Sequence, residues 1–376
     1  MNVAMLLSGG VDSSVALCRL RELGYRHVTA FYLKIWLEDE LAHIGECPWE
    51  DDLHYARSVA DRLSVPFEVV SLQEAYYERV VDYALAELRA GRTPSPDIFC
   101  NQRVKFGVFW ERIAGGAGRF DAVATGHYAR IERTGDRVLL KRAPDPVKDQ
   151  TYFLSHLSRE QLARAIFPVG DLHKQDVRRL AREWDLPNQE RPDSQGICFL
   201  GTIRYPEFVR HYLGERPGDI IERSTGRVLG EHRGYWFHTI GQRQGLGLGN
   251  GPWYVVGKDV ERNVVFVAHA DEVSDVAVSE FRVGSLTWIN EAPPCDTPLS
   301  LKLRHGPQTI GCRLFPDGNG ALRVVMKTPD RGVAPGQFAV FYDGEVCLGS
   351  GRILEPASQR SGSPEIVAST APGSAG

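Results

Sequence analysis

Two hydrophobic patterns alternate along the first 200 residues of the chain. Short apolar runs over residues 5–7, 28–36 and 66–71 predict buried strands, because aliphatic and aromatic side chains dominate them. The stretches 50–63 and 74–90 carry apolar residues at helical spacing and predict amphipathic helices. Strands that alternate with helices are typical of a parallel sheet, so we expect an α/β fold in this part.

The pattern changes after about residue 200. A helix is predicted over residues 205–213, short strands with Gly turns follow, and the Gly-rich stretch 238–249 is expected to be an ordered loop without a nucleotide role. Tight alternation over 280–355 without helical spacing predicts a small β-barrel. The predicted division is an N-terminal α/β domain at 1–200, a small central domain at 201–279, a C-terminal β-barrel at 280–355 and a disordered tail at 356–376.

The composition is that of a soluble globular protein. The chain has 376 residues, 43% of them hydrophobic and 24% charged, and is too long for one ordinary core. No apolar run approaches the roughly 18 residues that a membrane helix needs, and the first strand begins too early to leave room for a leader sequence. Seven cysteines without a regular framework indicate a reducing compartment. We therefore expect a cytoplasmic protein that does not contact a membrane.

The net charge of −4 conceals an uneven distribution. Residues 1–100 carry 9 Lys or Arg against 16 Asp or Glu, whereas residues 101–182 carry 16 against 9. A basic segment of this kind fits a nucleic-acid partner, and on charge alone it fits a solvated surface equally well.

A candidate phosphate site follows the first strand. Ser-Gly-Gly-Val-Asp-Ser-Ser at residues 8–14 opens a predicted helix at 11–20, whose free N–H groups and dipole attract an anion. The two glycines allow close approach of the backbone, and the three serines add hydroxyl donors. The loop lacks the Gly-Lys-Ser/Thr of a Walker A motif and the spacing of a dinucleotide-binding motif. The alternative is a Gly-Ser turn without a ligand.

A second candidate lies at residues 93–106, where two prolines end the preceding helix. Cys100 follows them, near the start of a helix expected at about Asn101. The dipole and nearby cations would lower the pKa of this thiol and favour thiolate. Asp97 lies one turn earlier, would raise that pKa somewhat and is placed to shuttle a proton. Alternatively, Cys100 is a small buried hydrophobic residue.

Further candidates come from single polar residues at expected strand ends and turns. Gly126, in a strand predicted over 120–130, would allow an adenine to approach the backbone. His127 is either a phosphate or nucleic-acid contact or a structural histidine. The polar residues 148–150 either meet a substrate or form a loop and helix cap. Cys198 alone resembles a structural cysteine, and the absence of C-x-x-C argues against a zinc ribbon or a dithiol, so no metal ligand is predicted.

Several short motifs occur in a fixed order along the chain. After Ser-Gly-Gly-Val-Asp-Ser-Ser come Pro-Asp-Ile-Phe-Cys-Asn (96–101), Ala-Thr-Gly-His-Tyr-Ala (124–129), Lys-Asp-Gln (148–150), Ser-Gln-Gly-Ile-Cys-Phe (194–199) and Thr-Ile-Gly-Gln-Arg-Gln-Gly-Leu-Gly (239–247). Together they closely resemble the bacterial and organellar tRNA-specific 2-thiouridylases, over nearly the whole chain except the tail. The first motif is shared by all ATP pyrophosphatases. The Asp-x-x-Cys and the later Gly-Ile-Cys-Phe are specific to this family.

The resemblance implies an N-terminal PP-loop ATP pyrophosphatase domain that binds ATP with Mg²⁺ on the nucleotide. It implies adenylation of the C2 oxygen of the wobble uridine of tRNA, which makes AMP the leaving group and releases pyrophosphate. From the pattern alone, Leu33 either packs on a bound base or is an ordinary core leucine. The residues that match the family's nucleotide site are Leu6, Leu7, Ser8, Gly9, Gly10, Val11, Asp12, Ser13, Leu33 and Gly126.

The resemblance also implies roles for two cysteines and a carboxylate. Cys198 would carry a persulfide received from a sulfur relay protein, Cys100 would be the paired catalytic thiol, and Asp97 matches a proposed general acid and base. Cys100 would either attack the activated carbon or release sulfide from the persulfide, with formation of a Cys100–Cys198 disulfide. The sequence does not choose between these routes or identify the sulfur donor.

The substrate that the resemblance implies is tRNA with Lys, Glu or Gln anticodons, and we expect a monomer. Ser95 stands where many members have Asn and Leu33 where many have Met, two mild changes. An insertion at 35–40, together with Cys-Pro-Trp-Glu at 47–50, is more like that of cyanobacterial and plastid relatives. The matching tRNA contacts are Ser95, Pro96, Asp97, His127, Lys148, Asp149, Gln150, Arg304, His305 and Gln337.

Two other functions remain open from the sequence. Another ATP pyrophosphatase, such as an amidotransferase-coupled synthetase or argininosuccinate synthase, would need neither a second cysteine nor an RNA-binding barrel. A tRNA-binding module with a vestigial nucleotide site would bind tRNA without splitting ATP to AMP and pyrophosphate.

Overall fold

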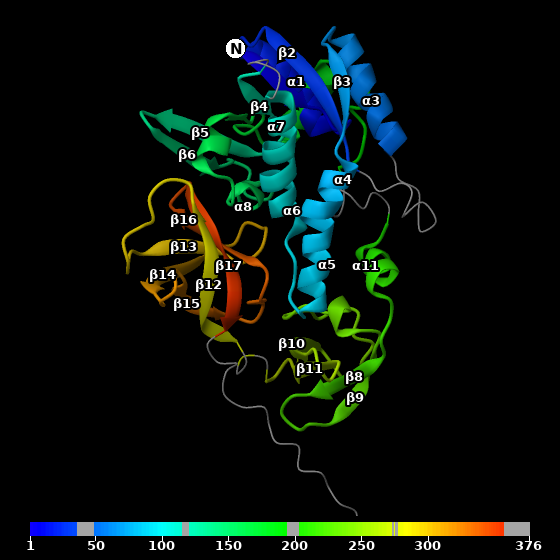
Figure 1. Ribbon diagram of the computed structural model, residues 1–376, viewed down its shortest axis with the longest axis vertical. Coiled ribbons are helices and arrows are strands. Elements are labelled where there is room, and N and C mark those ends of the chain that lie inside the picture. Colours follow the sequence, from blue (N-terminus) through cyan, green and yellow to red (C-terminus); the bar gives the residue numbers. More distant parts are fainter. Residues whose placement is uncertain (36–48, 115–119, 194–202, 273, 275–276, 357–376) are drawn as a thin grey trace, which may run out of the picture.

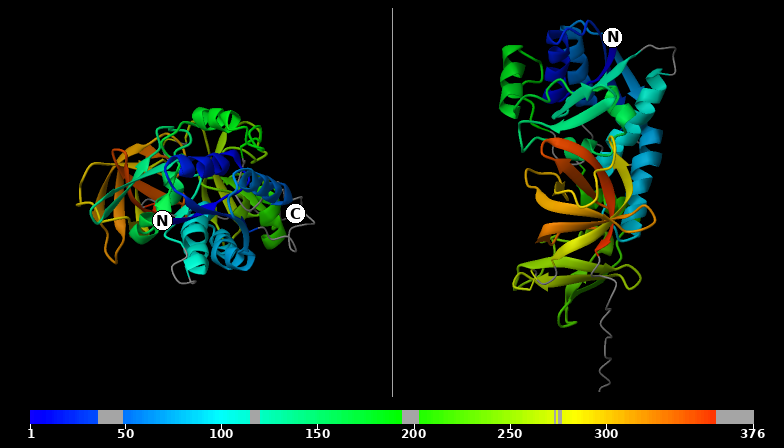
Figure 2. Two further views of the ribbon diagram at one scale, coloured as in Figure 1. Left: turned by 90° about the horizontal axis from the view of Figure 1, so that it is seen from above. Right: turned by 90° about the vertical axis from the view of Figure 1, so that its left-hand side faces the viewer.

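The computed structural model describes residues 1–35, 49–114, 120–193, 203–272, 274 and 277–356. An α/β domain, a β-barrel and a smaller β-sheet unit are visible in Figure 1, where the barrel lies beside α5 and the smaller sheet lies below both; Figure 2 gives two further views. The predicted fold class, an α/β domain followed by a central domain and a barrel, is confirmed. Residues 357–376 of the predicted tail lie outside the described residues.

Strand β1 lies at the centre of the first sheet. In the described chain this sheet has five strands in the order β3-β2-β1-β4-β7, all parallel. The chain builds one side of β1 first and then the other, so the switch in strand order lies between β1 and β4, where open α/β sheets bind ligands. The strands are β1 (Asn2–Leu6), β2 (His27–Lys34), β3 (Phe67–Ser71), β4 (Ala122–Ala124) and β7 (Ala165–Ile166).

Alternation along β1 explains why both faces of this sheet are covered. Ala4 and Leu6 belong to one buried cluster, whereas Val3 and Met5 belong to a second one on the other face. The helices of this domain are α1 (Val11–Glu22), α3 (Trp49–Arg62), α4 (Gln73–Tyr76), α5 (Asp82–Arg89), α6 (Pro96–Phe99), α7 (Phe109–Ala114), α8 (Thr151–Leu154), α9 (Arg159–Ala163) and α10 (Lys174–Glu183), with π-helical segments η1 (Tyr77–Val81) and η2 (Cys100–Val108).

The central unit begins with a helix and continues as a small sheet. In the part that the structure describes, its strand order is β10-β11-β8-β9, with β11 and β8 parallel and the other pairs antiparallel. Its elements are α11 (Tyr205–Leu213), β8 (Gly218–Glu222), β9 (Val228–His232), the short 3₁₀ segment η3 (Tyr235–Phe237), β10 (Trp253–Asp259) and β11 (Val264–His269).

Six of the described strands close the C-terminal barrel, because β12 pairs with both β15 and β17. The hairpin of β5 (Ala129–Thr134) and β6 (Arg137–Arg142) extends the same sheet: Lys141 and Leu140 pair with Val346 and Cys347. Residues predicted to belong to the first domain thus add to the barrel. The barrel strands are β12 (Val278–Trp288), β13 (Leu299–Lys302), β14 (Ile310–Pro316), β15 (Leu322–Asp330), β16 (Phe338–Asp343) and β17 (Val346–Pro356).

Two predictions about local structure are wrong. The strand predicted over 120–130 is interrupted: β4 ends at Ala124 and β5 begins at Ala129. The helix expected to begin at about Asn101 begins at Pro96, since proline fits the first helical position, where its missing N–H has no partner to lose. Both differences concern segments that carry candidate site residues.

Candidate active site

The loop after β1 has the geometry of an anion site. Gly10 is the N-cap of α1 and has no side chain, so the cap residue leaves the first N–H groups of the helix open to an external anion. The Ser13 hydroxyl donates to the Gly10 carbonyl at 2.9 Å and accepts from the Ser8 amide at 3.2 Å. Gly9 has a φ of +78°, and a Cβ there would lie 2.2 Å from the Asp52 carbonyl oxygen. Only glycine fits this turn.

Two side chains that the sequence did not single out hold this turn from behind. Asn188 donates to the Gly9 carbonyl at 2.7 Å and to the Ser14 hydroxyl at 2.9 Å. Arg191 donates to the same Gly9 carbonyl at 3.2 Å and pairs with Asp52 at 2.5 Å. Both side chains hold the Gly9 carbonyl in place. Nothing in the local sequence around Asn188 or Arg191 identifies them as part of the site.

Gly126 lies directly against the start of α1. A Cβ on it would lie 2.8 Å from the Ser13 amide nitrogen and 2.9 Å from the Asp12 carbonyl carbon. The ends of β1 and β4 therefore meet at backbone contact, as the prediction of a shared nucleotide site requires. Leu33, near the end of β2, is half-buried and packs on the core cluster on the Ala4 face of the sheet.

Asp12 is part of a charged cluster. Its carboxylate accepts from the Tyr128 hydroxyl at 2.7 Å and from the Lys174 ammonium at 2.6 Å. Lys174 also pairs with Asp193 at 2.8 Å, Asp193 with Lys148 at 2.7 Å, and Arg178 donates to Asp193 as well. Burial raises the pKa of the Asp193 carboxyl, but hydrogen bonds and charges from Lys148 and Lys174 outweigh it and hold that pKa well below its ordinary value.

Residues 148–150 lie beside the end of β4. The Gln150 side chain accepts from the Tyr128 amide at 2.9 Å, and the Gln150 amide donates to the Tyr128 carbonyl at 2.9 Å. Through Tyr128 and Asp12, this segment is connected to the phosphate loop. The structure thus brings together residues 12, 126–128 and 148–150, which are far apart in the sequence.

Asp149 differs from its two neighbours. Its side chain is 2% exposed and pairs with Lys302 of the barrel, which is 1% exposed, at 2.8 Å. It also accepts from the Thr151 hydroxyl at 2.9 Å. The Asp149 carboxylate also accepts from the amides of Ala143 and Thr151, so only its pair with Lys302 crosses to the barrel, and its contact with tRNA stays a prediction.

Cys100 is the fifth residue of the continuous helix that begins at Pro96, and its side chain is buried. It lies in the second turn of that helix. The helix dipole acts mainly on the first turn, so its stabilisation of a Cys100 thiolate is smaller than the sequence suggested. Asp97 lies one turn before it and is half-buried. Asn101 donates to the Asp97 carbonyl at 3.1 Å and to the Phe153 carbonyl of α8 at 3.2 Å. Ser95 precedes the helix, and its amide donates to Tyr83 at 3.4 Å.

Cys198 lies outside the described residues, which stop at Asp193 and resume at residue 203. Its predicted role and its pairing with Cys100 therefore stay predictions. Asp193, which the charged cluster holds, is the last described residue before this segment.

His127 lies next to Gly126 and is half-buried. Its Nδ1 lies 2.7 Å from the Thr125 hydroxyl. Burial, with a smaller effect of the Lys105 charge, lowers the pKa of its imidazole well below the ordinary value. The ring is therefore neutral at pH 7, and any contact with RNA would be a hydrogen bond between neutral groups or a stacking contact.

The barrel reaches the same region through two loops. The His305 ring stacks on Phe153 of α8 with the ring centroids 4.8 Å apart. The Thr93 amide donates to the Pro335 carbonyl at 2.8 Å, two residues before Gln337. Arg304 is exposed and pairs with Asp330 at 2.5 Å. The predicted contacts at 304, 305 and 337 thus lie on barrel loops that pack on the segment around Cys100.

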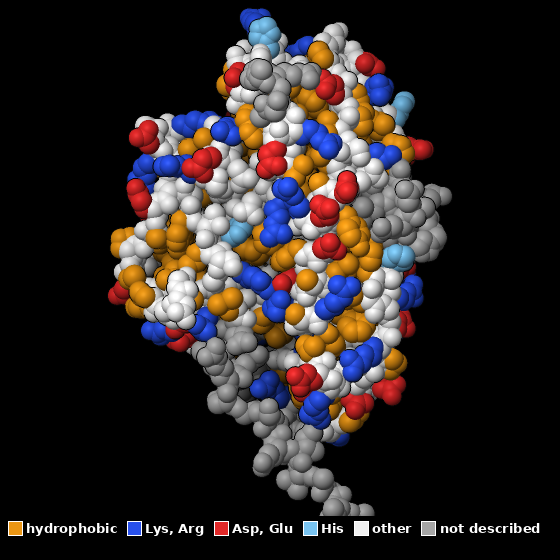
Figure 3. Space-filling view, viewed as in Figure 1, with side chains coloured by type: hydrophobic (Ala, Val, Ile, Leu, Met, Phe, Trp, Pro, Cys, Tyr) orange, Lys and Arg blue, Asp and Glu red, His pale blue; other side chains and the backbone are white. Residues whose placement is uncertain are grey.

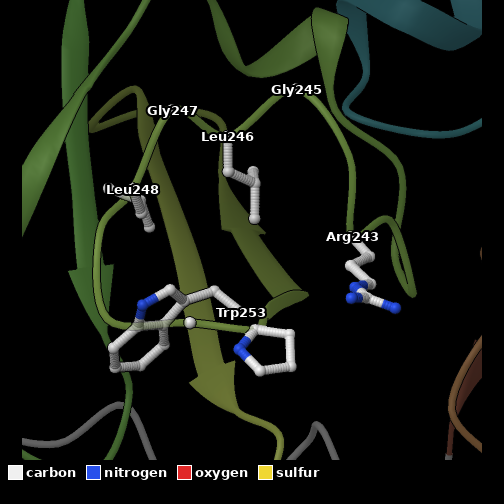
Figure 4. Close-up of a pocket in the computed structure, with 8 residues that line it drawn as sticks. Arg243, Gly245, Leu246, Gly247, Leu248 and Trp253 are labelled. Atoms are coloured by element: carbon white, nitrogen blue, oxygen red, sulfur yellow. The ribbon is translucent and has the colours of Figure 1, made fainter.

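A pocket of about 320 Å³ lies elsewhere, in the central unit, and Figure 4 shows the Gly-rich loop from Arg243 to Trp253 around it. In Figure 3, Lys and Arg side chains on the visible face are interspersed with acidic ones and do not form one basic patch. In the described parts of the chain, no three His, Cys, Asp or Glu side chains form a metal-binding group. No helix among those parts is long and apolar enough to cross a membrane.

Three family models match successive parts of the chain. They are described as a tRNA methyl transferase HUP domain at residues 1–202, a tRNA methyl transferase PRC-barrel domain at 206–269 and an aminomethyltransferase β-barrel domain at 278–353. Among solved structures, a U34-tRNA thiolase from Methanococcus maripaludis is 17% identical, with a TM-score of 0.29 over 52% of this chain and 61% of that one. A likeness this weak carries no functional inference.

Curated relatives match almost the whole length. The chain is 45% identical over 359 residues to the tRNA-specific 2-thiouridylase MnmA 1 of Bacteroides thetaiotaomicron, covering 94% of this chain and 99% of the relative. It is 44% identical over 365 residues to the tRNA-specific 2-thiouridylase MnmA of Porphyromonas gingivalis, with 94% and 99% covered. On this identity and coverage, the chain belongs to the tRNA-specific 2-thiouridylase family.

Proposed function

We propose that this protein is a tRNA 2-thiouridylase, a sulfurtransferase that replaces the C2 oxygen of the wobble uridine with sulfur. The observation that carries the proposal is the identity of 45% over 94% of the chain with a relative named for this reaction. The uncapped start of α1 and the close contact of Gly126 with it support ATP as the energy source.

ATP would bind across the switch between β1 and β4. The amides of residues 8–13 would hold its phosphates, and Gly126 would leave room for the adenosine. Mg²⁺ is usually held by one or two carboxylates together with substrate phosphates, and Asp12 offers a carboxylate beside the loop. The uridine C2 oxygen would attack the α-phosphorus, pyrophosphate would leave, and the C2–O bond would become breakable.

The sulfur step would use two cysteines. A persulfide on Cys198 would supply the sulfur atom, and AMP would leave C2 with the original oxygen. In one route Cys100 attacks the Cys198 sulfur, forms the Cys100–Cys198 disulfide and releases sulfide, which displaces AMP from C2. In the other, Cys100 displaces AMP from C2, the outer persulfide sulfur then displaces Cys100 from C2, and the Cys100 thiolate breaks the S–S bond to leave 2-thiouridine and the same disulfide. Two electrons from a cellular reductant would then restore the thiols. Asp97, one turn from Cys100, would transfer a proton in this step.

The tRNA would lie over the region where the barrel loops meet α6 and α8. Ser95, Pro96, Lys148 and Gln150 come from the α/β domain, and Arg304, His305 and Gln337 come from the barrel. The stacked pair of His305 and Phe153 supports this arrangement, because aromatic rings beside cations bind unpaired bases. The tRNAs with Lys, Glu and Gln anticodons, the relay protein, the monomeric state and the cytoplasmic location stay predictions.

The direct test is incubation with unmodified tRNA, ATP-Mg²⁺ and a persulfide or sulfide source, followed by mass spectrometry of the nucleosides. We expect 2-thiouridine together with stoichiometric AMP and pyrophosphate. If tRNA binds but no AMP forms, the protein is a binding module. If the wild-type protein forms AMP without any 2-thiouridine, and the Cys198→Ala variant forms AMP at the wild-type rate, the protein is a different ATP pyrophosphatase.

The Cys100→Ser variant is expected to lose thiolation below detection while its Kd for tRNA stays within about twofold, because the exchange removes the thiol and little volume. Cys312→Ser is the matched control, since Cys312 is also buried but lies in barrel strand β14. Thiolation by the Cys100→Ser variant at the wild-type rate would remove Cys100 from the mechanism.

A further inference from the structure

The charged cluster beside the phosphate loop joins three cations to the carboxylates of Asp12 and Asp193. Lys148, Lys174 and Arg178 surround Asp193, and Lys174 also reaches Asp12. Asp145 also lies close, and its carboxylate accepts backbone amides of residues 147, 148 and 174. Among the described residues, three cations therefore share this region with three carboxylates.

The three cations are not equivalent. Arg178 also donates to the carbonyls of Gln189 at 3.2 Å and Arg191 at 2.5 Å. These backbone contacts hold its guanidinium in place. Lys148 is 35% exposed at the edge of the cluster. Lys174 is 14% exposed and is the cation that touches the phosphate loop itself. An ammonium has three donors, and two carboxylates account for two of them.

The backbone of Lys174 is held in place. It is the first residue of α10, and its amide donates to the Asp145 carboxylate at 3.0 Å. The side chain extends from this fixed point to Asp12 at 2.6 Å. A lysine on a rigid base, with its charge beside a helix start, is placed to bind phosphate oxygens as a point charge.

We propose that Lys174 binds the pyrophosphate portion of ATP, and that Asp193 is the counter-ion that Lys174 gives up when nucleotide binds. This inference rests on the proposed function, since it assumes that ATP occupies the loop at residues 8–13. Asp193 retains Arg178 when Lys174 moves to the phosphates. Asp193 also keeps Lys148 and Lys174 keeps Asp12, so neither carboxylate is left without a cation.

Removing the two charges separates this role from a structural one. If Lys174 binds phosphate, Lys174→Gln weakens nucleotide binding, whereas Asp193→Asn strengthens it by removing the competing carboxylate. If the cluster only holds the fold together, both variants break the same network and weaken binding alike. Opposite changes in nucleotide affinity for the two variants therefore distinguish phosphate binding by Lys174 from a purely structural role.

The experiment is calorimetric titration of the full chain, in Mg²⁺ buffer, with an ATP analogue that has a methylene bridge between the α- and β-phosphorus. For Lys174→Gln we expect the Kd to rise about 10- to 100-fold, the loss expected for one charged hydrogen-bond donor. The Kd for AMP, which lacks the pyrophosphate, should stay within about twofold. Lys174→Arg should recover part of the affinity, and thermal unfolding of each variant shows whether it folds.

Arg179→Gln is the matched control. Arg179 lies on the same helix, is 57% exposed and pairs with Glu183 and Asp176, so its removal should leave both affinities unchanged. Equal weakening of the analogue and of AMP by Lys174→Gln, or weakening by Asp193→Asn, would overturn the proposal. If the wild-type chain binds neither nucleotide, the proposed function fails instead.

Discussion

At the scale of single residues, the site depends on glycines whose neighbours leave no room for a side chain. Gly9 needs a left-handed turn beside Asp52, and Gly126 needs contact with the Ser13 amide. The sequence predicted that both glycines allow a ligand to approach the backbone. The physical reason for Gly126, that β4 ends against α1, appears only when strand order is known.

The Gly126→Ala variant is therefore expected to lose nucleotide affinity by at least about tenfold and stability by about 1–3 kcal/mol, the usual effect of overpacking a tight contact. Nucleotide titration and urea unfolding measure the two effects. Gly249→Ala is the control, because no heavy atom lies within 4 Å of a Cβ there and its φ is not positive. Unchanged nucleotide affinity in Gly126→Ala would mean that this contact does not shape the nucleotide site.

At the scale of elements, α8 joins the two halves of the predicted tRNA surface. Gln150 caps this short helix and contacts the end of β4, while Phe153 contacts both Asn101 and His305. Immediately before α8, Asp149 forms the buried pair with Lys302 of β13. One four-residue helix thus sets the α/β domain against the barrel.

Breaking this buried pair should cost more than breaking an exposed one. Lys302→Met leaves the Asp149 carboxylate buried and unpaired, so we expect the free energy of unfolding to fall by about 3–5 kcal/mol. Adding Asp149→Asn should recover part of this loss. Glu345→Gln, which removes an exposed pair with Arg130 in the same sheet, should cost less than about 1 kcal/mol. Equal losses of unfolding free energy for Lys302→Met and Glu345→Gln in urea would contradict this prediction.

At the scale of the whole molecule, one buried histidine, His156, lies where the α/β domain meets the barrel. His156, just after α8, has Ser350 of β17 at 3.0 Å from Nδ1 and Thr287 of β12 at 3.3 Å from Nε2. Burial, with a smaller effect of Arg103, lowers the pKa of His156 from 6.5 to about 4. Burial likewise lowers the pKa of His238, in the central unit, to about 4.

Stability should therefore fall as the pH drops from about 6.5 to about 4. In this window the unfolded chain binds protons that the folded chain excludes, so the folded state is favoured fully above 6.5 and progressively less below it. For His156 alone the loss between pH 7 and pH 5 is about 2 kcal/mol. Comparing urea unfolding at both pH values, His156→Gln should reduce the pH dependence by this amount. An unchanged dependence would show that His156 is not the titrating group.

The sequence predicted the order of parts, most strands and helices, and the phosphate loop, because these depend on local periodicity and on glycine and proline at turns. It identified α11 at its observed bounds, 205–213, and β3 to within one residue. It failed where long-range contact overrides the local pattern. Gly126 interrupts an otherwise strand-like run, and Pro96 starts the helix of Cys100 a turn early.

Tertiary structure alone decided which polar residues work together. Lys174, Asp193, Asn188 and Lys302 look like ordinary surface residues in the sequence, and each acquires its role from a partner more than 100 positions away or from the cluster around Asp193. Burial also separated Asp149 from its neighbours Lys148 and Gln150. Local sequence determines the elements, but charge pairing and burial depend on which elements pack together, and that is a property of the complete fold.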